Sequence, residues 1–340
     1  MAAGLIRLAH GSGGLLTQEL VHSLFVRTLG DEELSRLLDA AVLDHSSALQ
    51  AGSRLAMTTD AYVVDPLEFP GGDIGKLAVC GTVNDLAATA AQPLWMSAAW
   101  ILEEGLEIER LRRLVFSMKE AAAEAGIRLV TGDTKVVPHG LAGGAYIGAA
   151  GVGIIPPGRD VGPHRIQPGD AILVNGTLGD HGMAIMLLRE GISMDTPIES
   201  DCAPLNGLVE ALFEVGISVH CLRDATRGGV GAVLCELALQ SGLGMIVHEE
   251  ALPVREAVAA ACEILGLDPL FVANEGKMVA FLPASEAERA LAVWRAHPYG
   301  RGAALIGEVA PGKPIVRLRT TIGSERQVRL PAGELLPRIC

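Results

Sequence analysis

The stretch TTDAYVVDPLEFPGGDIGKLAVCGTVNDLA, residues 58–87, combines three local patterns that predict the fold around it. The alternating, β-branched run over residues 54–64 predicts a strand that carries Asp60. Residues 71–91 have the pattern of a glycine turn followed by a helix, and Asp85 lies in that helix among small residues. A strand, a glycine loop and a helix therefore carry two carboxylates within one short region.

Outward from this stretch, the chain has the pattern of an α+β protein in which helices and strands are mixed rather than strictly alternating. Pro156-Pro157-Gly158 is the clearest break in the pattern. We therefore predict an N-terminal domain of residues 1–157, a C-terminal domain of residues 158–330 and a tail of residues 331–340. The remaining predicted helices span 15–29, 111–125, 181–190, 204–215, 229–240 and 255–265, the remaining strands span 127–130, 140–155, 171–174 and 278–282, and 315–330 is a hairpin.

Composition and charge exclude several classes of function. Hydrophobic residues make up 49% of the 340 residues and charged residues 20%, which is typical of a folded protein. The formal net charge of −13 repels phosphate backbones and anionic headgroups, so we expect no general binding to nucleic acid or membranes. The first ten residues lack a secretory signal pattern, and the glycine-rich run 140–158 favours a buried strand over a membrane span. We expect a cytoplasmic protein.

Five aspartates in turns or at the ends of predicted elements are candidates for metal binding, namely Asp44, Asp60, Asp85, Asp133 and Asp224. A single residue of this kind is usually a helix cap or part of an Asx turn. Several of them in apolar surroundings need another explanation, since a buried carboxylate has to be paired or to bind a cation. Mg²⁺ prefers hard oxygen ligands and is commonly shared between carboxylates and substrate phosphates. The spacing alone leaves both interpretations open.

Two glycine loops precede predicted helices. One covers residues 10–14 and contains Gly13 and Gly14, and the other covers residues 70–76 and ends at Lys76. Backbone N–H groups at a helix N-terminus can bind phosphate oxygens, and the helix dipole favours the anion. Neither loop matches the Walker A or the dinucleotide-binding pattern, so an ordinary turn remains the alternative for each.

Three further runs combine charged residues with glycine, namely GDTK at 132–135, DATRGG at 224–229 and NEGK at 274–277. Their charged residues, Lys135, Arg227 and Glu275 among them, are either members of surface ion pairs with little effect on stability or groups that neutralise phosphates and transfer protons. The spacing does not decide whether the three runs converge in space.

Six cysteines are present, and none has the spacing of a zinc site or of a C-x-x-C pair. Five lie in apolar stretches and are expected to be small buried side chains. Cys340 differs because it is the last residue of the sequence, two residues after Arg338, which favours a thiolate. A thiol on a flexible arm can be loaded at one place and delivered to another, whereas the alternative is an accidental terminal residue.

The stretch 58–87 resembles the signature of the AIR synthetase-like ATP-binding superfamily, which includes AIR synthetase, selenophosphate synthetase, thiamine-monophosphate kinase and the HypE family of hydrogenase maturation factors. GDTKVV at 132–137, RDATRGGV at 223–230, NEGKM at 274–278 and the terminal PRIC resemble the HypE family in particular. The resemblance covers nearly the whole chain. The sequence differs from the family pattern around Asp44, where residues 43–47 are LDHSS and relatives tend to have an Asp-Asp or Asp-small-Ala run.

The resemblance implies a two-domain AIR synthetase-like (PurM-like) fold. Its N-terminal mixed or antiparallel sheet would form a shared barrel in a homodimer, its C-terminal domain would be an α/β sandwich, and its tail would be flexible. The implied activity is that of a carbamoyl dehydratase, which uses ATP and Mg²⁺ to convert an S-carboxamide on Cys340 into an S-cyanide for the iron centre of nickel–iron hydrogenase. The implied partners are the carbamoyltransferase HypF and the HypC–HypD complex, which accepts the cyanide.

The resemblance also implies a role for individual residues. The implied metal ligands are Asp44, Asp60, Asp85, Asp133 and Asp224. The implied ATP-binding residues are Gly13, Gly14, Thr59, Lys76, Thr82, Asn84, Asn175 and Arg227. The implied catalytic residues are Cys340, which carries the group, and Lys135 and Glu275, which handle protons near the thiol carbon.

Two other interpretations stay open. A small-molecule enzyme of the same superfamily, of the AIR synthetase or thiamine-monophosphate kinase type, would need no terminal thiol. Selenophosphate synthetase has its reactive residue near the N-terminus, where this chain has no cysteine before Cys80. A non-catalytic scaffold that only presents Cys340 predicts a degenerate ATP site, whereas this chain keeps the charged and polar residues of that site, Asp60, Asn84, Asp85, Lys135 and Glu275.

Overall fold

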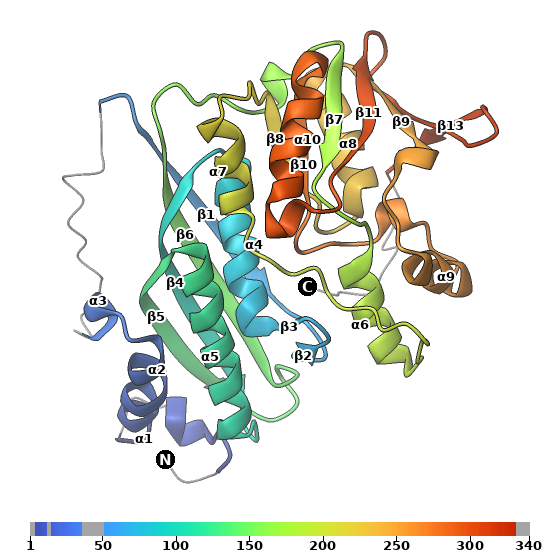
Figure 1. Cartoon of the computed structure of the whole chain (residues 1–340). Coiled ribbons are helices and arrows are strands. Elements are labelled where there is room, and N and C mark those ends of the chain that lie inside the picture. Colours follow the sequence, from blue (N-terminus) through green and yellow to red (C-terminus); the bar gives the residue numbers. More distant parts are fainter. Residues whose placement is uncertain (1–3, 12–14, 36–50, 331–340) are drawn as a thin grey trace.

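Two β-sheets pack on either side of a long central helix in this computed structural model, which describes residues 4–11, 15–35 and 51–330 (Figure 1). The first sheet has the strand order β1-β6-β4-β5. β6 runs antiparallel to both of its neighbours, whereas β4 and β5 run parallel, so the sheet is mixed as predicted. Its strands are β1 (Arg54–Tyr62), β4 (Gln92–Glu103), β5 (Arg128–Val137) and β6 (Ala145–Ile155).

Helices cover one face of the first sheet. α4 (Ile74–Ala88) packs on β1 and β6, and α5 (Ile108–Ala125) packs against α4. Side chains alternate along β1, so that Ala56 and Tyr62 are buried under the helices, whereas Leu55 and Met57 are 64% and 74% exposed. We call the side that carries Leu55 and Met57 the outer face of the first sheet.

The N-terminal helical run closes the far end of this sheet. α1 (Leu15–Leu20), a π-helical turn (Val21–Val26) and α2 (Arg27–Leu29) follow one another without a break and end at Gly30, whose φ of 68° suits glycine. The ring of Phe25 lies 5.9 Å from that of Trp100 on β4. The helix predicted over 15–29 is thus confirmed, and α3 (Glu32–Ser35) follows it.

The second sheet is covered on both faces. Its order is β13-β12-β9-β11-β7-β10-β8, and all neighbours are antiparallel except β12 and β9. Ile172 and Phe281 face α8, whereas Leu173 and Leu282 face α7 and α10. The strands are β7 (Asp170–Val174), β8 (Cys221–Asp224), β9 (Gly244–His248), β10 (Met278–Pro283), β11 (Ala304–Ala310), β12 (Val316–Arg319) and β13 (Glu325–Val328), and the helices are α7 (Asn206–Glu214), α8 (Gly229–Ser241) and α10 (Ala287–Ala296).

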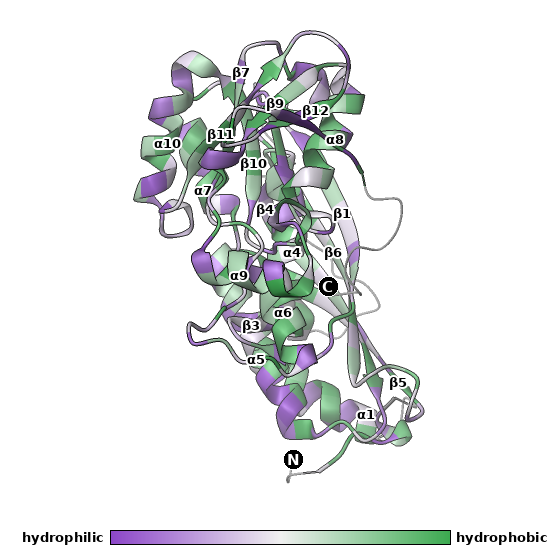
Figure 2. Ribbon diagram, turned by 90° about the vertical axis from the view of Figure 1, so that its right-hand side faces the viewer, coloured by the Kyte–Doolittle hydropathy of each residue, from purple (hydrophilic) through white to green (hydrophobic). Residues whose placement is uncertain are grey.

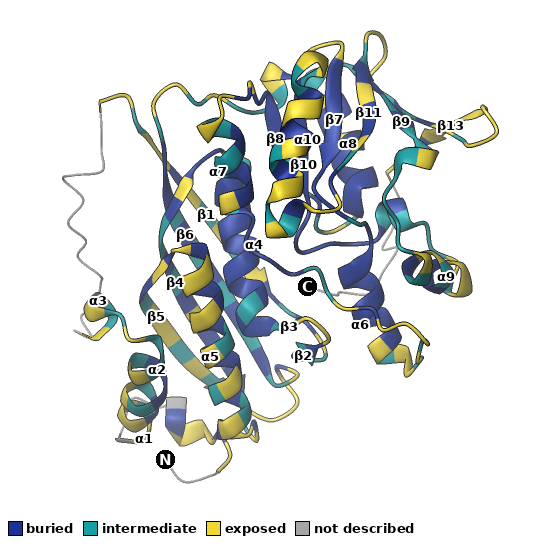
Figure 3. Ribbon diagram, in the orientation of Figure 1, coloured by how far each residue is buried: buried dark blue, intermediate teal, exposed yellow. Residues whose placement is uncertain are grey.

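α4 is the element that both halves share. The carboxylate of Asp73 caps its N-terminus by accepting the N–H groups of Gly75 and Lys76 at 2.7 and 3.0 Å. Figure 3 shows α4 largely buried, and its residue Ala87 joins the core between α7 and α10. α6 (Asp180–Glu190) and α9 (Glu256–Leu265) add buried residues to the core that contains α4 and α5.

The two halves are therefore not independent bodies, because their apolar cores meet along α4. Figure 2, turned by 90° from Figure 1, shows the second sheet at one end of the molecule and the N-terminal helices at the other. A two-strand ladder of β2 (Glu68–Phe69) and β3 (Gly72–Asp73) leads into α4. No helix within the described residues is long and apolar enough to cross a membrane.

Most predicted elements are confirmed, and the exceptions are specific. The strand predicted over 127–130 continues to Val137, so Asp133 and Lys135 lie within β5 rather than in a turn. β4, β8, β9, β11 and α10 were not predicted. β4 gives no clear period of two, because small and large apolar residues alternate irregularly in QPLWMSAAWILE.

Candidate active site

A narrow acidic pocket opens where the edge strands of the two sheets meet on α4. β1 is an edge of the first sheet and β8 is an edge of the second, and both contact α4. We call this cavity the acidic pocket. Its lining consists of Asp60, Ala61, Tyr62, Gly81, Asp85, Asp224, Thr226, Arg227 and Glu275. Three of the predicted metal ligands, one predicted ATP-binding residue and one predicted catalytic residue are thus brought together.

Strand and helix geometry place Asp60 and Asp85 at this pocket. Residues two apart on β1 share a face, so Thr58, Asp60 and Tyr62 all lie on the side that α4 covers. The Thr58 hydroxyl donates to Asp85 Oδ2 at 2.6 Å. Gly81 permits this close approach, because a β-carbon there would lie 2.5 Å from the Tyr62 hydroxyl. The small residues of α4 therefore bring Asp85 against β1.

Like charges crowd the acidic pocket. Burial, followed by the carboxylates of Asp85 and Asp60, raises the pKa of Asp224 to about 7. Burial also raises the pKa of Asp85, an effect that the Thr58 hydrogen bond opposes and Asp60 reinforces. The pKa of Tyr62 is raised well above its ordinary value by burial and by Asp60. A cation among these carboxylates would relieve their repulsion.

The donor set of the pocket fits Mg²⁺ together with phosphate oxygens. Among the described residues, no group of three or more His, Cys, Asp or Glu side chains is close enough to enclose a metal ion by itself. Mg²⁺ is usually held by one or two carboxylates and completes its shell with water and substrate phosphates. Asp60, Asp85 and Asp224 offer hard oxygens in that arrangement, and Arg227 lines the same pocket as a cation for phosphate.

Glu275 reaches the pocket from a loop that precedes β10. The residue is buried to 3% exposure, and the loop 274–277 has neither helical nor strand structure. Side chains hold its backbone in place, since the Asn84 amide donates to the Glu275 carbonyl at 3.3 Å and the Asn175 amide donates to the Gly276 carbonyl at 3.1 Å. A carboxylate that is shielded from water beside the metal-binding acids is suited to proton transfer.

Several predicted ATP-binding residues lie away from this pocket. The Asn84 amide is engaged with Ala203, Leu205 and Glu275, so it joins α4 to the second half. The Thr82 hydroxyl lies within the core and bonds Ala78 and Tyr62.

Three more predicted ATP-binding residues also lie away from the acidic pocket, namely Lys76, Asn175 and Thr59. Lys76 and Asn175 line a second cavity on the other side of the loop 274–277. The Asn175 side-chain oxygen accepts the Met278 N–H at 2.7 Å, which ties β7 to β10. Thr59 is exposed on the outer face and donates to the Ala149 carbonyl at 3.0 Å.

Asp133 and Lys135 lie on β5, at the opposite edge of the first sheet from Asp60. Their side chains form an ion pair at 3.4 Å and are 63% and 67% exposed. Ala61, Gly148, Ala99 and Asp133 are paired in sequence across the four strands, so Asp133 belongs to the outer face. Within one chain, β6 and β4 therefore separate these two residues from the acidic pocket.

Four predicted residues, Gly13, Gly14, Asp44 and Cys340, lie outside the described residues. The sequence analysis missed Tyr62, Thr58 and Thr226. Tyr62 and Thr58 could have been found from the period of two on either side of Asp60. It also missed Asp201, which holds the loop of Glu275 and lies in a run without any charge or glycine pattern.

Comparison with known proteins identifies the family. Residues 38–155 match the N-terminal domain, and residues 167–318 the C-terminal domain, of the AIR synthase related proteins. The chain is 49% identical over 339 residues to the carbamoyl dehydratase HypE of Rhodobacter capsulatus, covering 98% of each chain.

Solved structures support the same family assignment. A HypE structure in complex with ATP superimposes with a TM-score of 0.92 at 46% identity, covering 98% of this chain and 99% of the other. A HypE–HypF complex matches with a TM-score of 0.80 at 46% identity, covering 92% and 99%. The chain belongs to the AIR synthase related family and, within it, to the HypE carbamoyl dehydratases of hydrogenase maturation.

Proposed function

We propose that this protein is an ATP-dependent carbamoyl dehydratase that converts an S-carboxamide on Cys340 into an S-cyanide. One observation carries the proposal: the acidic pocket gathers Asp60, Asp85, Asp224, Arg227 and Glu275 in a chain that matches a carbamoyl dehydratase along its whole length. The cyanide would supply the iron centre of a nickel–iron hydrogenase.

The chemistry explains why such a pocket is needed. An amide oxygen is a poor leaving group, and transfer of the γ-phosphoryl group of ATP to it turns it into a good one. The C–O bond then breaks, phosphate and ADP leave, and the two N–H protons are lost as the C≡N bond forms. The reaction therefore needs electrostatic stabilisation for the phosphates and a base near the nitrogen.

Residues of the acidic pocket match these needs. Asp60, Asp85 and Asp224 would hold Mg²⁺, which offsets the charge of the triphosphate when bound. Arg227 would neutralise a phosphate, and buried Glu275 would accept an N–H proton of the carboxamide.

A second copy of the chain would bring the strand that carries Asp133 and Lys135 next to β1. The outer face exposes Leu55 and Met57, and among residues 4–11, 15–35 and 51–330 no further strand pairs with the outer edges of β1 and β5. Pairing of β1 with β5 of a second copy would cover that face and close both edges into a shared barrel. Such a homodimer would place Asp133 and Lys135 of one copy beside β1 of the other, the strand that carries Asp60.

The proposed reaction needs one partner that supplies the carbamoyl group and another that accepts the cyanide. The solved HypE–HypF complex supports HypF as the enzyme that loads the carbamoyl group. We propose the HypC–HypD complex as the acceptor of the cyanide and the cytoplasm as the site of the reaction.

Intact-mass measurement tests the function. The chain is incubated with HypF and carbamoyl phosphate, and Mg-ATP is then added. We expect a carbamoyl adduct on the C-terminal peptide that loses one water only when ATP is present. Cys340→Ala should carry no adduct, whereas Asp224→Asn should carry an adduct that keeps its water.

Two results would contradict the proposal. An adduct on Cys340 that never loses water would make the chain a carrier. The absence of any adduct on Cys340, with normal loading of a known HypE protein in parallel, would instead favour a small-molecule ATP-dependent enzyme.

A further inference from the structure

The loop 274–277, which carries Glu275, is held by side chains that come from distant parts of the chain. Asn84 on α4 and Asn175 after β7 bind its carbonyl groups, as described above. The Asn274 side chain accepts the Gly179 N–H at 2.8 Å and donates to the Ala225 carbonyl at 2.9 Å. The backbone of the loop also pairs with Ala225, whose carbonyl accepts the Asn274 N–H at 3.2 Å and whose N–H donates to the Lys277 carbonyl at 2.9 Å. The backbone and side-chain contacts together position Glu275.

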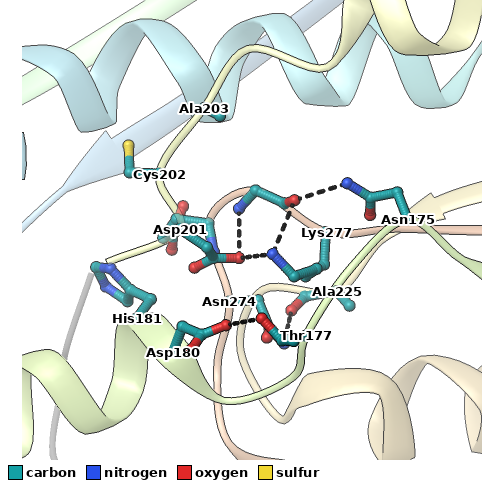
Figure 4. A network of polar contacts seen from close by, with 12 residues as sticks. Asn175, Thr177, Asp180, His181, Asp201, Cys202, Ala203, Ala225, Asn274 and Lys277 are labelled. Atoms are coloured by element: carbon teal, nitrogen blue, oxygen red, sulfur yellow. Dashed lines mark hydrogen bonds and ion pairs between the residues drawn. The ribbon is translucent and has the colours of Figure 1, made fainter. Parts of the chain in front are cut away.

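Asp201 makes the most concentrated set of these contacts (Figure 4). Its carboxylate accepts the Glu275 N–H at 3.1 Å, the Gly276 N–H at 3.0 Å and the Lys277 ammonium at 2.7 Å. Both charged side chains are only 7% exposed. A β-carbon at Gly276 would overlap the carbonyl oxygen of Asp201, so the two backbones are as close as glycine allows.

The charge of Asp201 is stable in this setting. Burial of the carboxyl opposes ionisation, but the Lys277 ammonium, followed by His181 and the Glu275 N–H, outweighs it, so the pKa of Asp201 is lowered. An ionised carboxylate accepts several hydrogen bonds at once, and an amide of the same size cannot, because half of it is a donor. The hydrogen bonds of the Glu275 and Gly276 N–H groups thus depend on this one carboxylate.

We propose that Asp201 is a positioning residue, which fixes the backbone of Glu275 so that the Glu275 carboxylate faces the acidic pocket. The inference rests on the proposed function, in which Glu275 accepts a proton from the carboxamide. Asp201 itself lines the second cavity and not the acidic pocket, so it acts through the loop rather than on the substrate. A misplacement of about 1 Å in a reacting group can lower a rate by about 100-fold.

The chain contains a matched control for a purely structural role. Asp170 is also buried, at 3% exposure, and it also binds a cation-forming side chain and a backbone N–H: His220 Nδ1 at 2.8 Å and the Gln167 N–H at 2.8 Å. It lines neither cavity. Asp170→Asn therefore disturbs a similar buried network without touching the loop of Glu275.

The test compares Asp201→Asn with Asp170→Asn in full-length, carbamoylated protein. We expect Asp201→Asn to lower the single-turnover rate of dehydration by about 10- to 100-fold, while the Kd of Mg-ATP changes by less than about threefold. Asp170→Asn should keep the rate within about threefold of the unsubstituted protein. Hydrogen exchange of the peptide 272–280 should accelerate in Asp201→Asn and not in Asp170→Asn.

A double variant separates positioning from stability. Asp201→Asn with Lys277→Met leaves no unpaired buried charge, so the melting temperature should recover relative to Asp201→Asn alone, whereas the rate should stay low. Recovery of the rate along with stability would overturn the proposal. So would equal rates and equal exchange in the two single variants. Hydrogen exchange tests whether Asp201 holds the loop 274–277 even in a protein that does not dehydrate the carboxamide. Failure of the proposed function would therefore abolish dehydration in every variant, whereas failure of this inference would leave hydrogen exchange equal in the two single variants.

Discussion

The two sheets of this protein differ in how many of their faces are covered by helices. In the second sheet, β7 is buried at every position, because α8 covers one face and α7 and α10 cover the other. In the first sheet, the helices that the structure describes cover one face, and Met57 on the outer face is 74% exposed. The second sheet is stabilised by its own chain, whereas the first exposes the face on which we propose that another copy packs.

The acidic pocket lies where this difference matters. It is built from the edge strand β1 of the half-covered sheet, the edge strand β8 of the fully covered sheet and the helix α4 between them. The fully covered sheet provides a rigid support for Asp224 and the loop of Glu275. The half-covered sheet provides Asp60 on a strand whose other neighbour can come from outside the chain.

The largest expected effect is on stability in the second sheet. Phe281 is fully buried, so Phe281→Ala should lower the free energy of unfolding by about 3–5 kcal/mol at any protein concentration. Met57→Ala should change it by less than about 0.5 kcal/mol when the protein is dilute. Urea denaturation at several protein concentrations checks both values. Equal losses in the two variants under dilute conditions would contradict the contrast between the sheets.

The next effect concerns self-association through the outer face. Met57→Asp places a charge where we propose that a second copy packs, and it should weaken dimerisation by at least about 100-fold, which is about 2.7 kcal/mol. Sedimentation velocity measures the change, and circular dichroism should show an unaltered fold.

Ile322→Asp is the control for this substitution. Ile322 is 89% exposed in the turn between β12 and β13, far from the first sheet, and its replacement should leave association unchanged. A monomeric unsubstituted protein, or a Met57→Asp dimer of normal affinity, would show that the outer face is not the interface.

The sequence predicts the two sheets unequally well. β1 alternates between buried and exposed residues and is found from its period of two, whereas β8, β9 and β11 are short strands whose pairing depends on distant segments. Asp60 and Asp85 follow from local patterns, and Glu275 from the NEGK run. That these residues meet Asp224 in one pocket depends on tertiary packing, which no local spacing encodes. The same is true of the hydrogen bonds between Asp201 and the loop 274–277.

A third prediction concerns the acidic pocket between the sheets. The pKa of Asp224 rises from 3.8 to about 7 in the folded protein, because burial and neighbouring carboxylates favour its protonated form. The folded state thus binds a proton that the unfolded state has lost between about pH 4 and 7, so the magnesium-free protein becomes less stable as the pH rises through that range.

Asp224→Asn should reduce this pH dependence to the part that comes from the raised pKa of Asp85, and it should raise the free energy of unfolding by about 2 kcal/mol at pH 7 without magnesium. Thermal melts from pH 4 to 8, with and without Mg²⁺, measure it. With Mg²⁺ the order should reverse, since the variant loses a ligand. If the melting temperature of Asp224→Asn equals that of the unsubstituted protein at every pH, the pKa of the Asp224 carboxyl is not raised in the folded state.

The smallest effect compares two glycines of β6 that lie on opposite faces of the first sheet. A β-carbon at Gly151 would meet Thr82 at 2.6 Å and Leu86 at 3.1 Å on α4, whereas one at Gly148 would meet nothing nearer than Ala99 at 4.0 Å. Gly151→Ala should therefore cost about 1 kcal/mol in dilute protein by pushing α4 from the sheet. Gly148→Ala should be neutral or stabilise by about 0.5 kcal/mol, since alanine restricts the unfolded chain. If both substitutions cost the same in dilute protein, the outer face is as tightly packed as the covered one, and the difference between the two sheets disappears.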